Sequence, residues 1–374
     1  MKISKILIIG ASPHSLVNFR GELIKAFVER GVSVVALAGG ATSDEIVSIQ
    51  ELGARYIDAP VVRTSTNPFT DFKTMCFFEE VFKEETPDFV IAYTIKPVIW
   101  GGMAAKRFPN IRFIALITGL GYAFEGAGIK RILLRFIVSR LYKAALNRSD
   151  QVFFQNYDDL NYFLQRNLVS SKKSNVLPGS GVPLNYFKQQ PFPKSDIVFL
   201  MVSRLLKEKG VYHFVDAARI VKKQFPNAKF QLLGGLDTSP DGIKYDVVDE
   251  WNECGYIEYL GETKDVRSVF SQSHVFVLPS YYREGLPRTI LEAMATGRPV
   301  LTTNNVGCRE PILEGENGWL VPVKDSVTLA ERMIWFIENP DQIESMGLSS
   351  RKIAEEKYDV HKVNERMLEI MGLS

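Results

Sequence analysis

Short apolar runs alternate with amphipathic segments along almost the whole chain. In the first half, the apolar runs predict strands at Lys5–Gly10, Ser33–Leu37, Tyr56–Ala59, Phe89–Tyr93, Phe113–Thr118 and Gln151–Gln155. The segments between them have helical patterns, at Val17–Arg30, Ser43–Leu52, Asp71–Lys83, Pro97–Lys106 and Ile132–Leu146. Strands that alternate with helices in this way predict a parallel sheet that is covered by helices on both faces.

The pattern weakens once and then restarts. The segment from Leu177 to about Ser195 is rich in proline, glycine and glutamine, which is typical of a linker. Further strands are predicted at Ile197–Val202, Lys229–Leu233, Ile257–Leu260, His274–Leu278, Val300–Thr303 and Trp319–Val321. We therefore expect two doubly wound, Rossmann-like α/β domains, 1–182 and 183–374, that face each other across a cleft. The last predicted helix, 360–371, could cross back to the first domain.

Composition agrees with this organisation and excludes several classes of protein. A chain of 374 residues is too long for one ordinary core. The net charge of +2 gives no reason to expect a nucleic-acid partner. Three widely spaced cysteines match no disulfide or zinc pattern, as expected in a reducing cytoplasm. No stretch approaches the ~18 apolar residues of a transmembrane helix, and the first residues do not resemble a signal peptide.

The most informative candidate site is the loop that follows the predicted strand His274–Leu278. It reads Glu284-Gly285-Leu286-Pro287, and a helix is expected to open near Pro287, because proline is tolerated at the first helical position. Glu292 lies about one turn into that helix and is expected to face the same crevice. Exposed N–H groups at a helix start bind anions, and two carboxylates accept hydroxyl donors. A sugar nucleotide offers both a pyrophosphate and hydroxyls.

A cluster of cations opens the second predicted domain. Ser203-Arg204 follows its first strand, and Lys209 stands at the next helix start. Two cations and a helix dipole at one point would suit a pyrophosphate leaving group; the alternative is a solvated basic turn. Gly234 and Gly261 end two further strands and could admit a nucleoside closely, although such turns favour glycine anyway.

In the first predicted domain, Gly10 follows the first strand but lacks the full dinucleotide fingerprint, so it is a donor-binding candidate without any prediction of NAD. We expect acceptor-binding residues here, at the cleft ends of a helix and two strands: Arg20, Lys96, Thr118, Gly119 and Gly121. A surface arginine is the alternative for Arg20. His14 lies in a predicted cleft loop, where contact with the substrate is left open.

The segment 128–143 is basic, apolar and helical in pattern. Lys130, Arg131, Arg135 and Arg140 are interleaved with leucine, isoleucine and phenylalanine. Such a helix can lie on an anionic membrane surface; the alternative is a core helix with a basic outer stripe. The histidines have no metal-ligand spacing and no D-x-D sequence occurs, so we expect neither a metal nor any other cofactor.

With these motifs the chain resembles the retaining glycosyltransferases of family 4, which have the GT-B fold, along essentially its whole length. The most specific parts are Glu284-x₇-Glu292 with Gly285-Leu286-Pro287, and Ser203-Arg204 followed by Lys209-Gly210. Within the family it is similar to bacterial N-acetylgalactosaminyltransferases that act on undecaprenyl-diphosphate-linked sugars. One departure is that Thr118-Gly119-Leu120-Gly121 stands where many members have a histidine. Another is that Gly181-Val182-Pro183 replaces the common Gly-Val-Asp.

The resemblance implies roles for individual residues. Arg204 and Lys209 would bind the donor diphosphate, and backbone N–H groups of Leu286 and its neighbours would hold phosphate. Glu292 would bind the ribose hydroxyls, and Glu284 would face the donor sugar near the reacting carbon. The catalytic candidates are therefore Glu284, Arg204 and Lys209.

The resulting hypothesis is a metal-independent transferase that is peripheral on the inner face of the cytoplasmic membrane. It would move an N-acetylhexosamine or hexose from a UDP-sugar to a polyprenyl-diphosphate-linked saccharide, with retention, in surface polysaccharide or glycan assembly. One alternative is a UDP-N-acetylglucosamine 2-epimerase of the same fold, against which the histidine-poor cleft and the Glu-x₇-Glu spacing argue. Another is a non-catalytic binding protein, which would be expected to have lost Arg204, Lys209 or Glu284.

Overall fold

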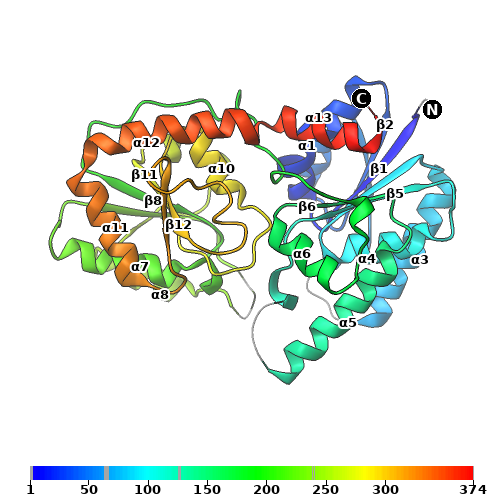
Figure 1. Ribbon diagram of the computed structural model, residues 1–374, viewed down its shortest axis with the longest axis horizontal. Coiled ribbons are helices and arrows are strands. Elements are labelled where there is room, and N and C mark those ends of the chain that lie inside the picture. Colours follow the sequence, from blue (N-terminus) through cyan, green and yellow to red (C-terminus); the bar gives the residue numbers. More distant parts are fainter. Residues whose placement is uncertain (1–2, 63–66, 125–127, 238, 240, 374) are drawn as a thin grey trace. The chain divides into compact units, whose positions relative to one another are not determined.

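The computed structural model describes residues 3–62, 67–124, 128–237, 239 and 241–373, and nothing is concluded for the others. The chain forms two compact units (Figure 1). Unit 1 comprises Met1–Ser180 together with His361–Ser374, and unit 2 comprises Gly181–Val360. The expected domains met after residue 182, whereas the units meet after residue 180 and the C-terminal residues belong to unit 1.

Unit 1 contains a seven-stranded parallel sheet in the order β3-β2-β1-β4-β5-β6-β7. Its strands are β1 (Lys5–Ile9), β2 (Ser33–Ala38), β3 (Ala54–Asp58), β4 (Phe89–Tyr93), β5 (Arg112–Ile117), β6 (Gln151–Phe154) and β7 (Ser174–Val176). Its helices are α1 (Pro13–Glu29), α2 (Ser43–Glu51), α3 (Pro68–Glu85), α4 (Ile95–Ala105), α5 (Ile129–Leu146), α6 (Tyr157–Gln165) and most of α13 (Val360–Met371). The short elements β7 and α6 were not predicted.

Unit 2 contains a six-stranded parallel sheet in the order β10-β9-β8-β11-β12-β13. Its strands are β8 (Val198–Val202), β9 (Lys229–Leu233), β10 (Glu258–Tyr259), β11 (Val275–Leu278), β12 (Val300–Thr303) and β13 (Gly318–Val321). Its α-helices are α7 (Val211–Lys222), α8 (Tyr245–Glu253), α9 (Arg267–Ser271), α10 (Arg288–Ala295), α11 (Ser326–Glu338) and α12 (Pro340–Ile353).

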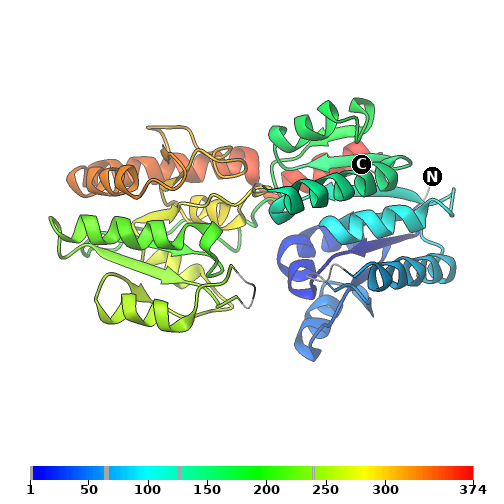
Figure 2. The same cartoon turned by 90° about the horizontal axis from the view of Figure 1, so that it is seen from below.

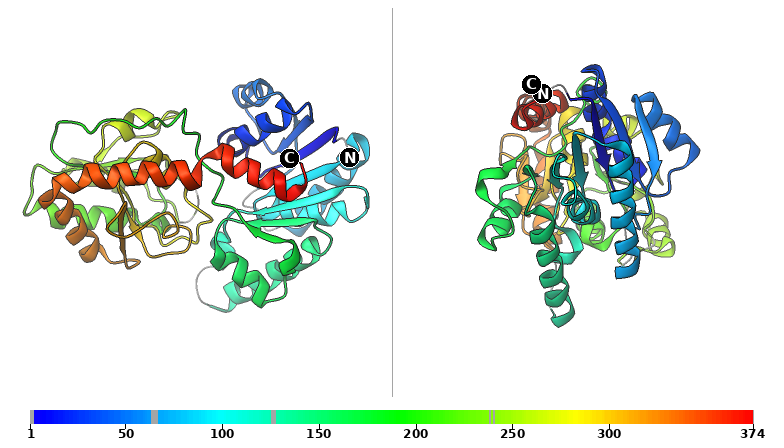
Figure 3. Two further views of the ribbon diagram at one scale, coloured as in Figure 1. Left: turned by 45° about the horizontal axis from the view of Figure 1, so that its top comes forward. Right: turned by 90° about the vertical axis from the view of Figure 1, so that its right-hand side faces the viewer.

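Both faces of the unit 1 sheet are buried under helices (Figure 2). Successive side chains of β1 enter different clusters: Leu7 and Ile9 pack on one face, and Ile6 and Ile8 on the other. This alternation explains why the strand reads as an unbroken apolar run. On the face of Ile6 and Ile8, the last helix, α13, contributes Val363, Met367 and Leu368 to the core (Figure 3).

In each sheet the strand order reverses direction at one place. This switch point lies between β1 and β4 in unit 1, and between β8 and β11 in unit 2. In doubly wound sheets, ligands bind beyond the carboxyl ends of the strands at the switch point, because the loops diverge there and leave a crevice. The loops after β8 and β11 therefore form the candidate ligand-binding region of unit 2.

Candidate functional site

The loops at the unit 2 switch point bring two predicted catalytic residues together. Lys209 ends a short 3-10 helix after β8, and Glu284 lies in the loop after β11. The Lys209 ammonium forms an ion pair with the Glu284 carboxylate, and the two side chains are only 14% and 12% exposed. The Lys209 Nζ atom also lies 5.4 Å from the centroid of the Tyr282 ring. Low exposure strengthens the attraction of Lys209 for an anionic ligand, and it equally strengthens the opposing repulsion from the Glu284 carboxylate.

Backbone packing holds these two loops against each other. The Glu208 carbonyl accepts hydrogen bonds from the backbone N–H groups of Tyr281 (2.9 Å) and Tyr282 (3.0 Å). Gly210 adopts a φ of +82°, and a Cβ atom there would lie 2.0 Å from the Pro279 carbonyl oxygen. Only glycine therefore lets α7 begin so close to the end of β11.

Arg204 lies in the loop after β8 and is held by a residue that the sequence did not single out. Its Nη1 atom lies 2.6 Å from Oδ2 of Asp237, which follows β9. Burial by itself would raise the pKa of Asp237, but hydrogen bonds from Ser239 and the Arg204 guanidinium hold that pKa below its usual value. The available signal was that Asp237 follows a strand whose loop neighbours that of β8.

A third loop, after β12, contacts the loop that carries Glu284 and donates hydrogen bonds to its backbone. The Thr303 hydroxyl donates to the Ser280 carbonyl, and Asn305 Nδ2 donates to the Tyr282 carbonyl at 2.9 Å. Gly307 has a φ of +83°, and a Cβ atom there would lie 2.7 Å from the Glu284 Cβ atom. The β12 loop thus constrains the backbone position of Glu284.

The helix predicted after the β11 loop, α10, begins one residue later than expected. Pro287 is the N-cap and α10 starts at Arg288, while Gly285, Leu286 and Pro287 are buried. Glu292 pairs with Arg288, whose Nε atom lies 3.0 Å from Oε1, and the Glu292 side chain is 13% exposed. Burial raises the pKa of Glu292, although the neighbouring Arg288 opposes the shift.

The predicted donor-binding residues near the ends of β8, β9 and β10 have clear packing roles. Ser203 donates its backbone N–H to the Leu233 carbonyl at 3.1 Å. A Cβ atom on Gly234 would lie 1.8 Å from the Ser203 carbonyl oxygen. Gly261 has a φ of +72° with open space around it, so the left-handed turn alone explains the glycine.

The unit 1 switch point is built around an aromatic ring. A Cβ atom on Gly10 would lie 2.2 Å from the Tyr93 hydroxyl oxygen, and this hydroxyl is 2.8 Å from Ser15 Oγ. The Arg20 guanidinium lies 5.0 Å from the Tyr93 ring centroid. Burial raises the pKa of Tyr93 to about 12, against the opposing effects of Ser15 and Arg20.

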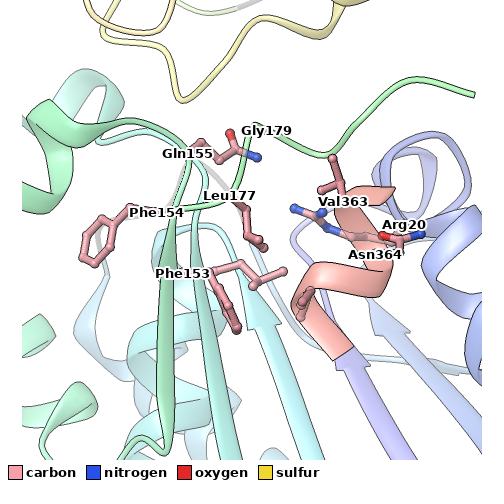
Figure 4. A pocket seen from close by; sticks show the side chains of 10 residues that line it. Arg20, Phe153, Phe154, Gln155, Leu177, Gly179, Val363 and Asn364 are labelled. Carbon is pink, nitrogen blue, oxygen red and sulfur yellow. The ribbon is translucent and has the colours of Figure 1, made fainter. Parts of the chain in front are cut away.

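Arg20 is only 6% exposed and lines a small pocket beneath α13 (Figure 4). The pocket also contacts Gln155, Gly179 and Asn364, and its inner void of about 10 Å³ has room for roughly one water molecule. Within the described part of the chain, the buried Nδ2 atom of Asn364 has no hydrogen-bond partner. The void is too small for a saccharide. His14, expected in a loop, lies in the first turn of α1 beside Asn18.

The other predicted acceptor residues follow β4 and β5, which are adjacent strands. Lys96, near the start of α4, pairs with Asp71 of α3 at 2.7 Å, and the side chains are 17% and 15% exposed. Thr118 follows β5 directly. Gly119 and Gly121 adopt φ values of +105° and +55°, which explains glycine at both positions.

Helix α5 exposes an apolar face rather than a basic stripe. Its large exposed apolar residues recur at helical spacing, so that they form one face: Ile129 (86%), Ile132 (62%), Leu133 (57%), Phe136 (55%) and Ile137 (46%). Lys130 and Arg140 are exposed beside this face, and the Arg140 guanidinium lies 5.0 Å from the Phe136 ring centroid. Arg131 and Arg135 are half-buried and interact with other groups.

Among the residues that the structure describes, no group of three or more histidine, cysteine, aspartate or glutamate side chains is arranged to hold a metal ion. No helix that the structure describes has both the length and the apolar character needed to cross a bilayer.

Both halves of the chain match family models of glycosyl transferases. Residues 184–353 match the family model of glycosyl transferases group 1, and residues 17–178 match a glycosyl transferase 4-like domain. The N,N'-diacetylbacillosaminyl-diphospho-undecaprenol α-1,3-N-acetylgalactosaminyltransferase of Campylobacter jejuni is 29% identical, with 95% of each chain covered. An Escherichia coli UDP-Gal:α-D-GlcNAc-diphosphoundecaprenol α-1,3-galactosyltransferase is 26% identical, with 72% of each chain covered.

Solved structures with the same fold include two that cover nearly the whole chain. Sucrose-phosphate synthase from Thermosynechococcus elongatus gives a TM-score of 0.80 at 20% identity, covering 98% of both chains. HepE from Anabaena, solved in complex with UDP, gives a TM-score of 0.77 at 18% identity, covering 98% of this chain and 99% of the other. These similarities establish the GT-B fold.

Proposed function

Because this chain is a glycosyltransferase that belongs to the group 1 family and has the GT-B fold, we propose that it transfers a sugar from a UDP-sugar to a polyprenyl-diphosphate-linked saccharide, with retention of configuration. The observation that carries the proposal is the meeting of Lys209 and Glu284 at the unit 2 switch point, with Arg204 on the same β8 loop. The names of two relatives, which specify undecaprenyl-diphosphate-linked acceptors, support the acceptor class.

In this proposal, Arg204 and Lys209 bind the donor diphosphate and stabilise the negative charge that builds on it as the sugar leaves. The bond from the anomeric carbon to the phosphate oxygen breaks, and the acceptor oxygen forms its bond on the same face. A phosphate oxygen of the leaving UDP takes the acceptor proton. Charge stabilisation of this kind can lower the barrier by several kcal/mol, because the cations are already in place before reaction.

Glu284 is assigned to the donor sugar, near the reacting carbon. Its ion pair with Lys209 keeps the carboxylate beside the position assigned to the diphosphate, and the β12 loop fixes its backbone. Glu292 is assigned to the ribose hydroxyls, and the backbone of Gly285–Pro287 to phosphate. Gly10, Gly234 and Gly261 lie at strand ends and are assigned to the donor. Of these three, only Gly261 has open space at its Cβ position, where a nucleotide could approach closely.

Unit 1 is assigned to the acceptor. Lys96, Thr118, Gly119 and Gly121 lie at the carboxyl ends of two adjacent strands, where a diphosphate headgroup would meet a cation and backbone N–H groups. Arg20, which lines the pocket beneath α13, is assigned here to shaping this region.

We also propose that α5 attaches the enzyme to the inner face of the cytoplasmic membrane. Its exposed apolar face spans Ile129 to Ile137, and Lys130 and Arg140 stand beside it, where they can meet anionic headgroups. Burying such side chains among lipids is favourable by roughly 1.5–3 kcal/mol each. A lipid-linked acceptor would then be within reach of an enzyme held at the same surface.

The test is a donor and acceptor panel. The purified protein is incubated with UDP- and other nucleotide-linked sugars, with and without a polyprenyl-diphosphate-linked saccharide, and UDP release and product are measured. We expect release to depend on the lipid-linked acceptor and the product to keep the donor's anomeric configuration by NMR. An inverted product, or equal release without any acceptor, would contradict the proposal.

The epimerase alternative is not favoured, since the curated relatives described above are glycosyltransferases. The same panel separates the two activities. An epimerase would change the configuration at C2 of UDP-N-acetylglucosamine with no acceptor present, and a transferase would leave that configuration intact.

A further inference from the structure

We propose that Asp237 is a positioning residue of the donor site, which orients the Arg204 guanidinium toward the diphosphate without touching the donor itself. This inference rests on the proposed role of Arg204 as a diphosphate ligand. It assigns a function to a residue that neither the sequence motifs nor the family resemblance singles out.

The loop that carries Asp237 is attached to the loop that carries Arg204 on both sides of the ion pair. Leu205 donates its N–H to the Gly235 carbonyl at 3.0 Å and accepts from the Ile243 N–H at 2.9 Å. Lys207 donates to the Asp241 carbonyl at 3.0 Å. These hydrogen bonds join described residues of the two loops on both sides of Asp237 in the sequence.

The Asp237 side chain is itself anchored at its second oxygen. Oδ1 accepts the backbone N–H of Ser239 at 2.9 Å, while Oδ2 faces Arg204 at 2.6 Å. A Cβ atom on Gly242 would lie 1.9 Å from the Asp237 carbonyl oxygen, so the close approach of these two residues requires glycine at position 242. An orienting carboxylate needs one oxygen held by the backbone and the other directed at the group that it orients, and Asp237 has both.

Exposure decides which partner orients the other. The Arg204 side chain is 44% exposed and Asp237 only 16%, so the long arginine is the adaptable member and the aspartate the fixed one. The pKa of Asp237 lies below its usual value, where burial is outweighed by hydrogen bonds from Ser239 and Arg204, so the carboxylate is charged at neutral pH. The ion pair engages Nη1, and a guanidinium carries five N–H donors in a planar fork.

The competing idea is that Asp237 occupies Arg204 in place of the donor and must be displaced. The two ideas predict opposite signs for the coupling between Asp237 and Arg204 in UDP binding, once the direct repulsion between Asp237 and the anion is removed. A double-mutant cycle removes it, because that repulsion acts whether or not Arg204 is present, whereas positioning acts only through Arg204.

The experiment measures UDP affinity by calorimetric titration at one salt concentration for the full-length wild type, Arg204→Ala, Asp237→Asn and the double variant. We expect Asp237→Asn to weaken UDP binding about tenfold more in the wild-type background than in the Arg204→Ala background, the size of a lost charge-assisted hydrogen bond. Asp216→Asn is the matched control, since Asp216 pairs with Arg219 at 3.2 Å on α7 of the same unit; it should leave UDP affinity unchanged.

The outcomes distinguish a failure of the donor role of Arg204 from a failure of the positioning role of Asp237. If Arg204→Ala leaves UDP affinity unchanged, the proposed donor role of Arg204 fails and the inference fails with it. If Arg204→Ala weakens binding but Asp237→Asn has the same effect in both backgrounds, only the positioning role is overturned. A smaller loss in the wild-type background than in the Arg204→Ala background would make Asp237 a competitor and also overturn it.

Discussion

The two units have the same doubly wound parallel topology but fill their switch points differently. In unit 2, the loops after β8 and β11 bring Lys209 and Glu284 together as a largely buried ion pair. In unit 1, the corresponding loops after β1 and β4 close on Tyr93, with Gly10 against its hydroxyl and Arg20 over its ring. Topology therefore determines where a crevice can form, and the side chains at the strand ends determine whether it can take an anion.

The largest effect is expected at the charged switch point. Lys209→Ala should lower the transfer rate by about 10²–10³-fold, because it removes charge stabilisation from the leaving diphosphate. Lys207→Ala is the matched control, since this exposed lysine lies in the same 3-10 helix. Steady-state UDP release is the measurement. Equal rates for the two variants would remove the functional distinction between the switch points.

A smaller effect is expected from the glycine that supports Glu284. Gly307→Ala forces a side chain into a φ of +83° and against the Glu284 Cβ atom, at a cost of roughly 1–3 kcal/mol. Gly40→Ala is the comparison in unit 1, because Gly40 has a φ of +72° with nothing within 4 Å of its Cβ position.

Thermal unfolding and UDP release should distinguish these two glycine variants. Gly40→Ala is expected to lower stability only, with activity retained at a temperature where the protein is folded. Gly307→Ala should also lower activity at that temperature. Retained activity in Gly307→Ala would mean that transfer does not depend on the backbone position of Glu284.

The unit 1 surface provides a third, more modest contrast, between apolar and charged contributions. Ile132→Ser with Phe136→Ser should weaken pelleting with anionic vesicles more than Lys130→Gln with Arg140→Gln. The reason is that buried apolar side chains contribute roughly 1.5–3 kcal/mol each, against ~1 kcal/mol for each surface cation. Val47→Ser, at an exposed position of α2, is the control. If the charge variant loses more binding than the apolar one, the attachment is mainly electrostatic.

No effect at all is expected from chelation. Activity should survive EDTA, because the proposed donor site binds the diphosphate through lysine and arginine rather than through a carboxylate-bound metal. UDP release is compared before and after treatment. Loss of activity that manganese or magnesium restores would show that the cations of unit 2 are insufficient on their own.

Much of the fold could be predicted because parallel strands are buried on both faces and read as unbroken apolar runs, as in β1 and β4. Short polar elements such as β7 carried no such signal. The meeting of Lys209 and Glu284 could be anticipated because both residues follow strands of one parallel sheet. Asp237 also follows a strand, but this signal could not single it out, since its pairing with Arg204 depends on which loops are neighbours in space. The exposed face of α5 was equally hidden, because a helix that is apolar and basic all round does not reveal which side packs inward.

The position of α13 in the core of unit 1 has a consequence for biosynthesis. Val363, Met367 and Leu368 complete the cluster that contains Ile6 and Ile8, yet they follow the whole of unit 2 in the chain. All residues of unit 2, Gly181–Val360, are made before them and can fold as soon as they emerge. Unit 1, although begun first, lacks part of its core until α13 has been synthesised. Truncation just before α13 should therefore leave a nascent chain that chaperones retain, with one finished half and one unfinished half.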